Sequence, residues 1–105
     1  MENIWYVYII KSTDGRLYTG ITIDVSRRWS EHCQSGGNTK KGAKFFWGRK
    51  PESLLFIMEA ENRSIACKEE AAIKKLVKGN KLLLIESNKN KLYNYPELAR
   101  LSSEG

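Results

Sequence analysis

The stretch over residues 4–22 constrains the fold more than any other part of the chain, because its pattern predicts two strands joined by a turn. Residues 4–11 and 17–22 are rich in β-branched and aromatic side chains, and Thr13-Asp14-Gly15 is a turn cluster between them. A two-residue loop would shift the pairing by one residue. A three-residue loop with Gly15 in the left-handed conformation places the apolar side chains on one face and the tyrosines on the other. We therefore predict the register that this loop sets.

The expected register sets Tyr8 opposite Gly20 and Ile10 opposite Tyr18. A core set then shares one face of the hairpin: Trp5, Val7, Ile9, Leu17 and Ile21. An amphipathic set shares the other face: Tyr6, Tyr8, Tyr18, Gly20 and Thr22. Because Gly20 has no side chain, we expect space beside the Tyr8 ring in which another group can approach the backbone closely.

Length and composition indicate one folded domain. The chain has 105 residues, 41% hydrophobic and 29% charged, which suits a single modest core. No apolar run approaches the roughly 18 residues of a membrane span, and the start lacks the features of a signal peptide, so we expect a cytoplasmic protein. Cys33, Cys67 and the one histidine, His32, lack the spacing of a zinc site, and we expect two reduced, partly buried thiols.

The positive charge is concentrated in one segment. The formal net charge is +6, and residues 26–50 hold seven cations against Glu31 alone. The cations are Arg27, Arg28, Lys40, Lys41, Lys44, Arg49 and Lys50. Four aromatic residues are interleaved with them, namely Trp29, Phe45, Phe46 and Trp47. An ordinary solvated surface can also carry charges, but their concentration among aromatic residues favours a phosphate-rich partner, namely nucleic acid.

A first helix is expected over residues 24–34, capped by Asp24. Its buried stripe should be Val25, Trp29 and Cys33, which recur at four-residue spacing. Arg28 and His32 are also four apart and line a flank beside that stripe. Since the helix follows the second strand directly, we expect this flank to meet the tyrosine face of the hairpin.

The second half of the chain predicts one more strand and further helices. We expect a loop over 38–52, a buried strand over 53–60, a helix from a cap at Asn62 or Ser64 to about Lys78, a break at Gly79-Asn80 and a short helix over 81–87. Glu69 and Glu70 fall where the apolar stripe of the longer helix should continue. A carboxylate there requires a cation, a metal or water, and pairing with Lys74 or Lys68 is the simplest alternative.

The predicted fold class is therefore α/β, with a small, mostly antiparallel three-stranded sheet flanked by helices. We place a single domain over residues 4–86. Residues 87–105 are expected to form a C-terminal extension that packs on this domain or trails from it.

This order of elements and residues resembles the GIY-YIG nuclease superfamily, and most closely its small stand-alone bacterial members. The matching residues are Trp5-Tyr6-Val7-Tyr8, Leu17-Tyr18-Thr19-Gly20-Ile21-Thr22, Asp24-Val25, Arg27-Arg28, Glu31-His32, Gly42-Ala43-Lys44, Gly48-Arg49-Lys50-Pro51, Arg63-Ser64, Glu70 and Ile73-Lys74-Lys75-Leu76. The chain departs from the family pattern at Tyr6, where the family has glycine, and at Thr19, where it has isoleucine. The motif tyrosines and Gly20 remain.

The resemblance implies a metal-dependent endonuclease that hydrolyses phosphodiester bonds, with DNA favoured over RNA and a role in DNA repair or recombination. It assigns Tyr8 and Tyr18 as the motif tyrosines, Arg28 as the arginine of the first helix and Glu70 as the ligand of Mg²⁺ or Mn²⁺. Mg²⁺ suits a single carboxylate because it keeps most of its waters. Asn94 is the candidate for the late asparagine of the family.

The implied chemistry gives each group a role. Tyr8 is the expected base or the relay to one, Arg28 offers paired donors to the phosphate, and Tyr18 positions water or Tyr8. His32 either assists catalysis or is structural. Arg27, Lys40, Lys41, Lys44, Arg49 and Lys50 are the expected nucleic-acid contacts. The alternatives are a non-catalytic nucleic-acid-binding module on the same scaffold and, more weakly, a partner-docking protein.

Overall fold

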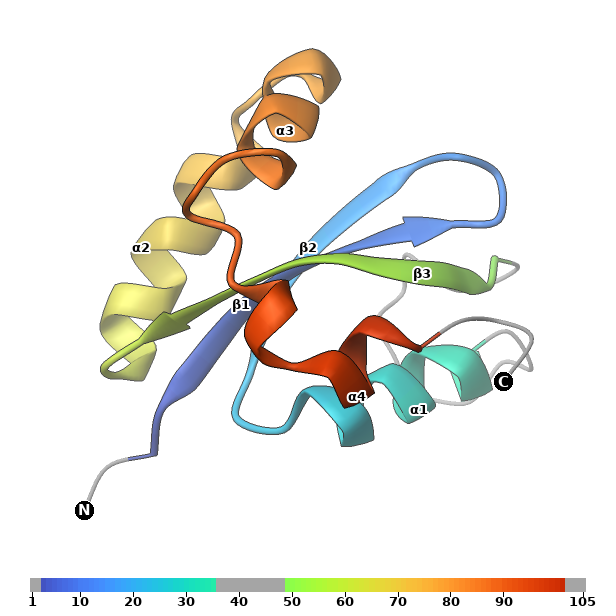
Figure 1. Cartoon of the computed structure of the whole chain (residues 1–105), viewed down its shortest axis with the longest axis horizontal. Helices are drawn as coiled ribbons and strands as arrows, with labels where there is room; N and C mark the ends of the chain where they lie inside the picture. The colour runs from blue at the N-terminus through green and yellow to red at the C-terminus, as the bar shows by residue number, and fades with distance from the viewer. Residues whose placement is uncertain (1–2, 36–48, 102–105) are drawn as a thin grey trace.

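The computed structural model describes residues 3–35 and 49–101. The first half contains β1 (Trp5–Ser12), β2 (Leu17–Thr22), α1 (Val25–Ser35) and β3 (Pro51–Ala60). The second half contains α2 (Arg63–Lys74), α3 (Lys78–Ile85), the 3₁₀ turn η2 (Leu92–Asn94) and α4 (Pro96–Ala99). One antiparallel sheet has the order β2-β1-β3, so the predicted fold class is confirmed (Figure 1).

The hairpin adopts the predicted register. Tyr8 lies opposite Gly20 and Ile10 lies opposite Tyr18. The backbone N–H of Ser12 donates to the carbonyl of Arg16 at 2.8 Å, and Gly15 has a φ of 83°. A left-handed glycine closing a three-residue loop is the arrangement that the turn sequence favours.

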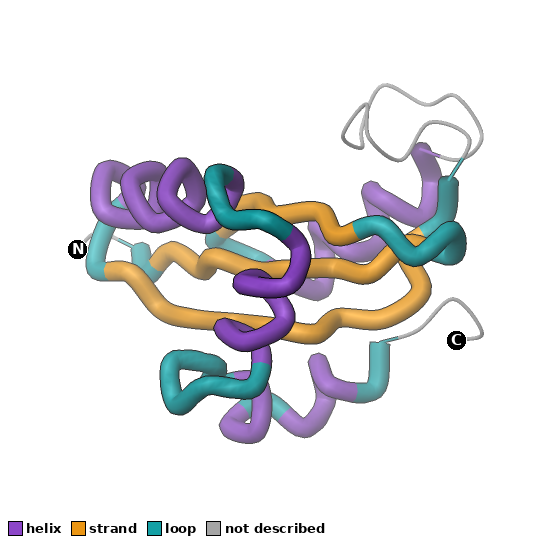
Figure 2. The backbone as a smooth tube through the Cα atoms, turned by 90° about the horizontal axis from the view of Figure 1, so that it is seen from above, coloured by secondary structure: helices purple, strands orange, loops and turns teal. Residues whose placement is uncertain are grey.

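Helices cover both faces of the sheet (Figure 2). On one face, Val7 and Ile9 pack with Phe56 and with Ala66 and Ile73 of α2. On the other, an equally buried cluster joins the sheet to α1 and the C-terminal segment: Tyr8, Ile10, Val25, Trp29, Leu54, Ile57 and Leu98. The second face is therefore a core face and not the amphipathic one that the sequence predicts, because α1 and α4 cover it.

The space that Gly20 leaves is already filled. A Cβ built on Gly20 would lie 2.5 Å from the hydroxyl oxygen of Tyr8 and 3.0 Å from the Tyr18 ring. The Tyr8 side chain therefore extends across β2 directly over Gly20, so the close approach expected at this position is made by the protein itself.

Three details differ from the sequence-based expectations. His32 and not Cys33 continues the buried stripe of α1, because the helix turns Trp29 and His32 toward the sheet and leaves Cys33 exposed. β3 begins at Pro51, which an edge strand accommodates although proline lacks an N–H. The break between α2 and α3 lies over residues 75–77, so Gly79-Asn80 falls inside α3.

The described part of the C-terminal segment packs against β3 through Asn90. The Asn90 side chain donates to the carbonyls of Leu55 and Ile85, both at 2.8 Å, and accepts from the backbone N–H of Ile57 at 3.3 Å. Leu98 joins the core beneath α1. Within the described ranges, no helix has both the length and the apolar character needed to cross a membrane.

We expect Gly20→Ala to lower the free energy of unfolding by about 1–3 kcal/mol, because the new methyl group overlaps the Tyr8 hydroxyl. Gly79→Ala is the matched control. Its Cβ would meet no atom within 4 Å, and alanine favours a helix, so stability should stay the same or rise by up to about 1 kcal/mol. Urea unfolding monitored by circular dichroism measures both changes, and equal effects of the two substitutions would contradict the packing that we describe.

Candidate active site

A buried hydrogen bond joins Tyr8 of β1 to His32 of α1. The Tyr8 hydroxyl lies 2.8 Å from Nε2 of His32, and the two residues are 1% and 0% exposed. The hydroxyl can donate to Nε2 when the ring hydrogen sits on Nδ1. The structure thus brings together two residues that the sequence proposed separately, and it removes both from water.

Tyr18 completes an aromatic group with this pair. Its ring centroid lies 5.3 Å from that of His32 in an edge-on arrangement and 6.2 Å from that of Tyr8. The three rings come from β1, β2 and α1, so the site depends on both the hairpin register and the seating of α1.

The electrostatic environment keeps the Tyr8–His32 pair uncharged. Burial lowers the pKa of His32 from 6.5 to about 3, and the positive charge of Arg28 acts in the same direction. Burial also raises the pKa of the Tyr8 hydroxyl far above its ordinary value. Tyr18 adds to that rise, whereas the charge and a hydrogen bond from Arg28 oppose it. At neutral pH the free protein therefore holds a neutral imidazole against a neutral phenol.

Arg28 lies one helical turn before His32 and is partly exposed. Its Nη1 is 2.8 Å from a carboxylate oxygen of Glu31. The sequence analysis names Glu31 as the one acid of the basic segment and as part of the family pattern but gives it no role, although its spacing of three residues from Arg28 is a recognisable helical pair. Glu31 orients the guanidinium at the edge of the aromatic group.

The structure separates the two glutamates that the sequence left open. The charge of Glu70 raises the pKa of Tyr8, so Glu70 lies within electrostatic reach of that hydroxyl. It also forms an ion pair of 3.4 Å with Lys74, which is one of the alternatives foreseen. Glu69 instead lines a hollow beside β3 together with Asn94. Neither Glu69 nor Asn94 thus belongs to the group around Tyr8.

Glu70 is the described side chain best placed to hold a metal near Tyr8. It is half-buried in α2, and no set of three or more His, Cys, Asp or Glu side chains gathers into a metal site within residues 3–35 and 49–101. A single carboxylate fits Mg²⁺, which retains waters and takes oxygens from a phosphate substrate.

The described part of the expected nucleic-acid surface begins at α1 and ends at the hairpin turn. Arg27 is exposed beside Arg28, and Nε of Arg49 lies 2.9 Å from a carboxylate oxygen of Asp14. Hydrogen bonds from Ser12 and Arg49 lower the pKa of Asp14 to about 2. Lys50 is exposed. Three of the expected contacts lie outside the described residues: Lys40, Lys41 and Lys44.

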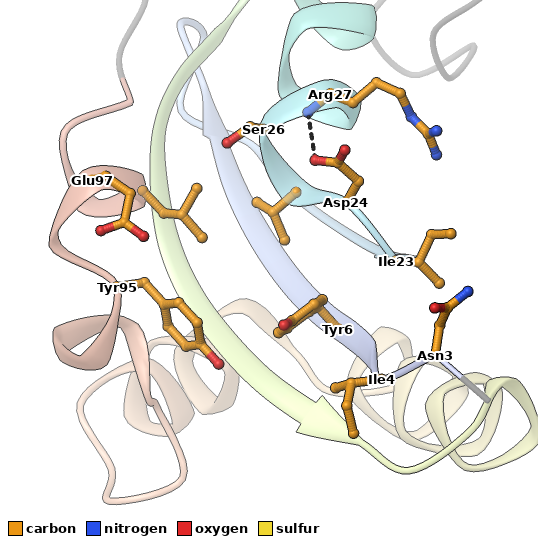
Figure 3. A pocket seen from close by; sticks show the side chains of 11 residues that line it. Asn3, Ile4, Tyr6, Ile23, Asp24, Ser26, Arg27, Tyr95 and Glu97 are labelled. Carbon is orange, nitrogen blue, oxygen red and sulfur yellow. Dashed lines mark hydrogen bonds between the residues drawn. The ribbon is translucent and has the colours of Figure 1, made fainter. Parts of the chain in front are cut away.

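A separate pocket of about 550 Å³ lies on the same sheet face, between the start of α1 and the C-terminal segment (Figure 3). Tyr6 and Tyr95 form one side of it, and Asp24, whose carboxylate accepts from the backbone N–H of Arg27, lies on the other. None of the residues around the Tyr8 hydroxyl lines this pocket. The candidate active site is therefore a packed side-chain group at the β2 edge.

We expect the ring resonances of His32 to stay at their neutral positions between pH 8 and 5, because burial holds the folded-state pKa near 3. The chain has one histidine, so the signals are unambiguous in a ¹H–¹⁵N NMR titration. As pH falls, the unfolded chain takes up this proton first. His32 therefore does not affect the pH dependence of stability above about pH 6.5. Between pH 6.5 and about 3 it lowers the free energy of unfolding as the pH falls, by up to about 1.4 kcal/mol per pH unit.

A midpoint near 6.5 in that titration would show that His32 is solvated, contrary to its packing against Tyr8. The variant His32→Gln supplies the control for the stability measurement, since it lacks the titrating ring. Its unfolding free energy should fall less steeply than that of the wild type as the pH drops from 6.5 to 3.

Comparison with known proteins shows which family the chain belongs to. A family model described as the GIY-YIG catalytic domain matches residues 4–82. A UPF0213 protein of Yersinia enterocolitica is 41% identical over 91 residues, which are 87% of this chain and 89% of that protein. The UPF0213 protein YhbQ of Escherichia coli is 43% identical over 81 residues, 77% of this chain and 76% of that protein.

Among solved structures, the solution NMR structure of a UPF0213 protein from Bacillus halodurans matches with a TM-score of 0.52 and 32% identity, over 93% of this chain and 99% of that one. As the motif residues predicted, the chain belongs to the GIY-YIG family, and it is similar to UPF0213 proteins.

Proposed function

We propose that this protein is a divalent-metal-dependent endonuclease that hydrolyses phosphodiester bonds in DNA. The observation that carries the proposal is the Tyr8 hydroxyl, which is hydrogen-bonded to His32 and lies under the opposing electrostatic influence of Arg28 and Glu70. A neutral proton relay beside one cation and one carboxylate is suited to activating water against a phosphate.

Tyr8 and His32 act together in this proposal. The Tyr8 hydroxyl is buried in the free protein, so the relay requires a water that enters with the substrate. The hydroxyl oxygen would accept a proton from that water while its own proton passes to Nε2 of His32, 2.8 Å away. The sequence expectation made Tyr8 the base or the relay to one, and we propose the relay. The raised pKa of Tyr8 makes a phenolate unfavourable in the free protein, and the lowered pKa of His32 makes an imidazolium unfavourable there as well. The relay leaves no charge on Tyr8, and it depends on the substrate to stabilise the imidazolium. The negative charge of a bound phosphate would favour the imidazolium that results.

Arg28 and Glu70 would stabilise the phosphate, the first by hydrogen bonds and the second through a bound metal. The guanidinium has five N–H donors in a planar fork, so it can hold Glu31 and a phosphate oxygen at the same time. Glu70 would hold Mg²⁺ or Mn²⁺, which would stabilise negative charge on the phosphate and lower the pKa of the attacking water. Tyr18 packs against both Tyr8 and His32 and keeps their geometry.

The second candidate is a module that binds nucleic acid without cutting it. One observation favours it, namely the ion pair between Glu70 and Lys74, which is the ordinary arrangement of a helix-surface glutamate. Under this proposal Glu70 has no role beyond the pair with Lys74.

We expect Glu70→Gln to abolish metal-dependent cutting of DNA while binding in EDTA persists. The assay uses supercoiled plasmid, single-stranded, flap and four-way-junction DNAs with Mg²⁺, Mn²⁺ or EDTA. Glu69→Gln is the matched control, because it makes the same change one residue away, on the β3 side of α2. It should cut at the wild-type rate. Equal cutting by both variants would remove Glu70 from the mechanism, and wild-type binding without cutting would favour the binding module.

We expect Tyr8→Phe to slow cutting by about 10²–10³-fold, since it removes the relaying hydroxyl. The fold should survive, because the phenyl ring still covers Gly20 and one hydrogen bond is typically worth about 1 kcal/mol. Tyr93→Phe, at a side chain that is 73% exposed, is the control and should leave the rate unchanged. Single-turnover cutting rates measure both, and an active Tyr8→Phe enzyme would refute the relay.

A further inference from the structure

A second group of cations lies outside the segment that the sequence singled out. Residues 71–81 contain Lys74, Lys75, Lys78 and Lys81 and no aspartate or glutamate. Three of these lysines are exposed at the end of α2 and the start of α3, and Arg16 at the hairpin turn is exposed as well. We call Arg16, Lys74, Lys75 and Lys78 the α2–α3 basic surface.

The hairpin turn joins this surface to the earlier basic segment. Nζ of Lys78 donates to the carbonyl of Gly15 at 2.8 Å, which fixes the start of α3 against the turn. In the same turn, Asp14 holds Arg49 and the backbone N–H of Thr13 donates to the carbonyl of Lys50 at 2.9 Å. Cations far apart in the sequence therefore meet at the hairpin turn.

Two of the four cations on this surface pair with carboxylates, Arg16 with Asp14 at 3.6 Å and Lys74 with Glu70 at 3.4 Å. Within residues 3–35 and 49–101, no carboxylate lies within ion-pair distance of Lys75 or Lys78. The ammonium group of Lys78 has three N–H donors, of which the Gly15 carbonyl takes one. These lysines are thus free to bind anions, and the hairpin contact restricts the motion of Lys78.

The α2–α3 basic surface lies next to Glu70, the candidate metal ligand. Lys74 is four residues from Glu70 and forms an ion pair with it, and Lys75 and Lys78 follow within the next turn of chain. A phosphate backbone lying on Lys78 and Lys75 would therefore pass beside Glu70. Lysine binds phosphate as a point charge without reading bases, so such a contact would position the strand and not select its sequence.

We propose that the α2–α3 basic surface, continuous with Arg49 and Lys50 across the hairpin turn, binds the backbone phosphates of the nucleic acid next to the cleaved bond. This inference rests on the proposed function, because the claim that the phosphates lie next to the cleaved bond requires Glu70, at the end of the row of cations, to be the metal ligand. It assigns phosphate contacts to four residues outside the 26–50 basic segment.

The test compares two double variants with equal loss of charge. Lys75→Gln/Lys78→Gln removes two cations of the surface. Lys89→Gln/Lys91→Gln removes two at the opposite edge of the sheet, where the Lys91 backbone N–H bonds to Ile57 of β3. Binding of a fluorescein-labelled 20-base-pair DNA duplex is measured by anisotropy in EDTA across a range of NaCl concentrations, so that no cutting occurs.

We expect the slope of log K against log salt to become shallower by about 1.8 in Lys75→Gln/Lys78→Gln, because each neutralised phosphate contributes about 0.9. The control should keep the wild-type slope. An equal change in both double variants would mean that only net charge matters, and an unchanged slope in Lys75→Gln/Lys78→Gln would place the phosphates elsewhere; either result overturns the proposal. The single variant Lys75→Gln removes no ion pair within the described residues, so the loss of such a pair cannot account for its share of the change.

The outcome for the surface is separable from the outcome for the enzyme. A shallower slope with no cutting by the wild type would retain the surface on a binding module and reject the nuclease. Metal-dependent cutting with an unchanged slope would retain the nuclease and reject the surface. An acidic protein or an anionic membrane as the true partner would leave duplex binding weak for wild type and variants alike, which also rejects the proposal.

Discussion

Tyr8 lies directly opposite Gly20 in the β1–β2 ladder, and this pairing decides how the candidate active site is built. Because Gly20 has no Cβ, the phenol ring can cross β2 at close range and present its hydroxyl to His32 of α1. A slip of one residue would set a β-branched side chain opposite Tyr8 and turn Tyr18 to the other face of the sheet. The short turn that ends at left-handed Gly15 prevents that slip.

Once the register is set, burial governs the chemistry. The same removal from water lowers the pKa of His32 and raises that of Tyr8, so each change favours the uncharged form. The hydrogen bond between Tyr8 and Nε2 of His32 lowers the cost of burying these two polar groups. The charges stand around the pair and not within it, on Arg28 and Glu70. The site thus consists of an uncharged Tyr8–His32 pair with charged side chains at its periphery.

The features that depend on local geometry were predicted correctly from the sequence. The hairpin register followed from turn length and side-chain alternation, and the sheet followed from the order of elements. The buried face of α1 was placed one residue off, at Cys33 where the structure has His32, because helix rotation is set by packing against the sheet and not by spacing alone. Glu69 and Glu70 share one helical stripe, so only the three-dimensional path of α2 could show which one lies near Tyr8.

The C-terminal segment adds a consequence for how this fold can be divided. The family model ends at residue 82, yet Asn90 supplies hydrogen bonds to backbone groups of β3 and α3, and Leu98 fills the core beside Trp29. A fragment cut at residue 82 would expose the β3 backbone groups that Asn90 satisfies and part of the apolar layer that supports α1. The packed unit of this protein therefore extends beyond the region that the family model matches, and the two should not be equated when the chain is shortened or fused.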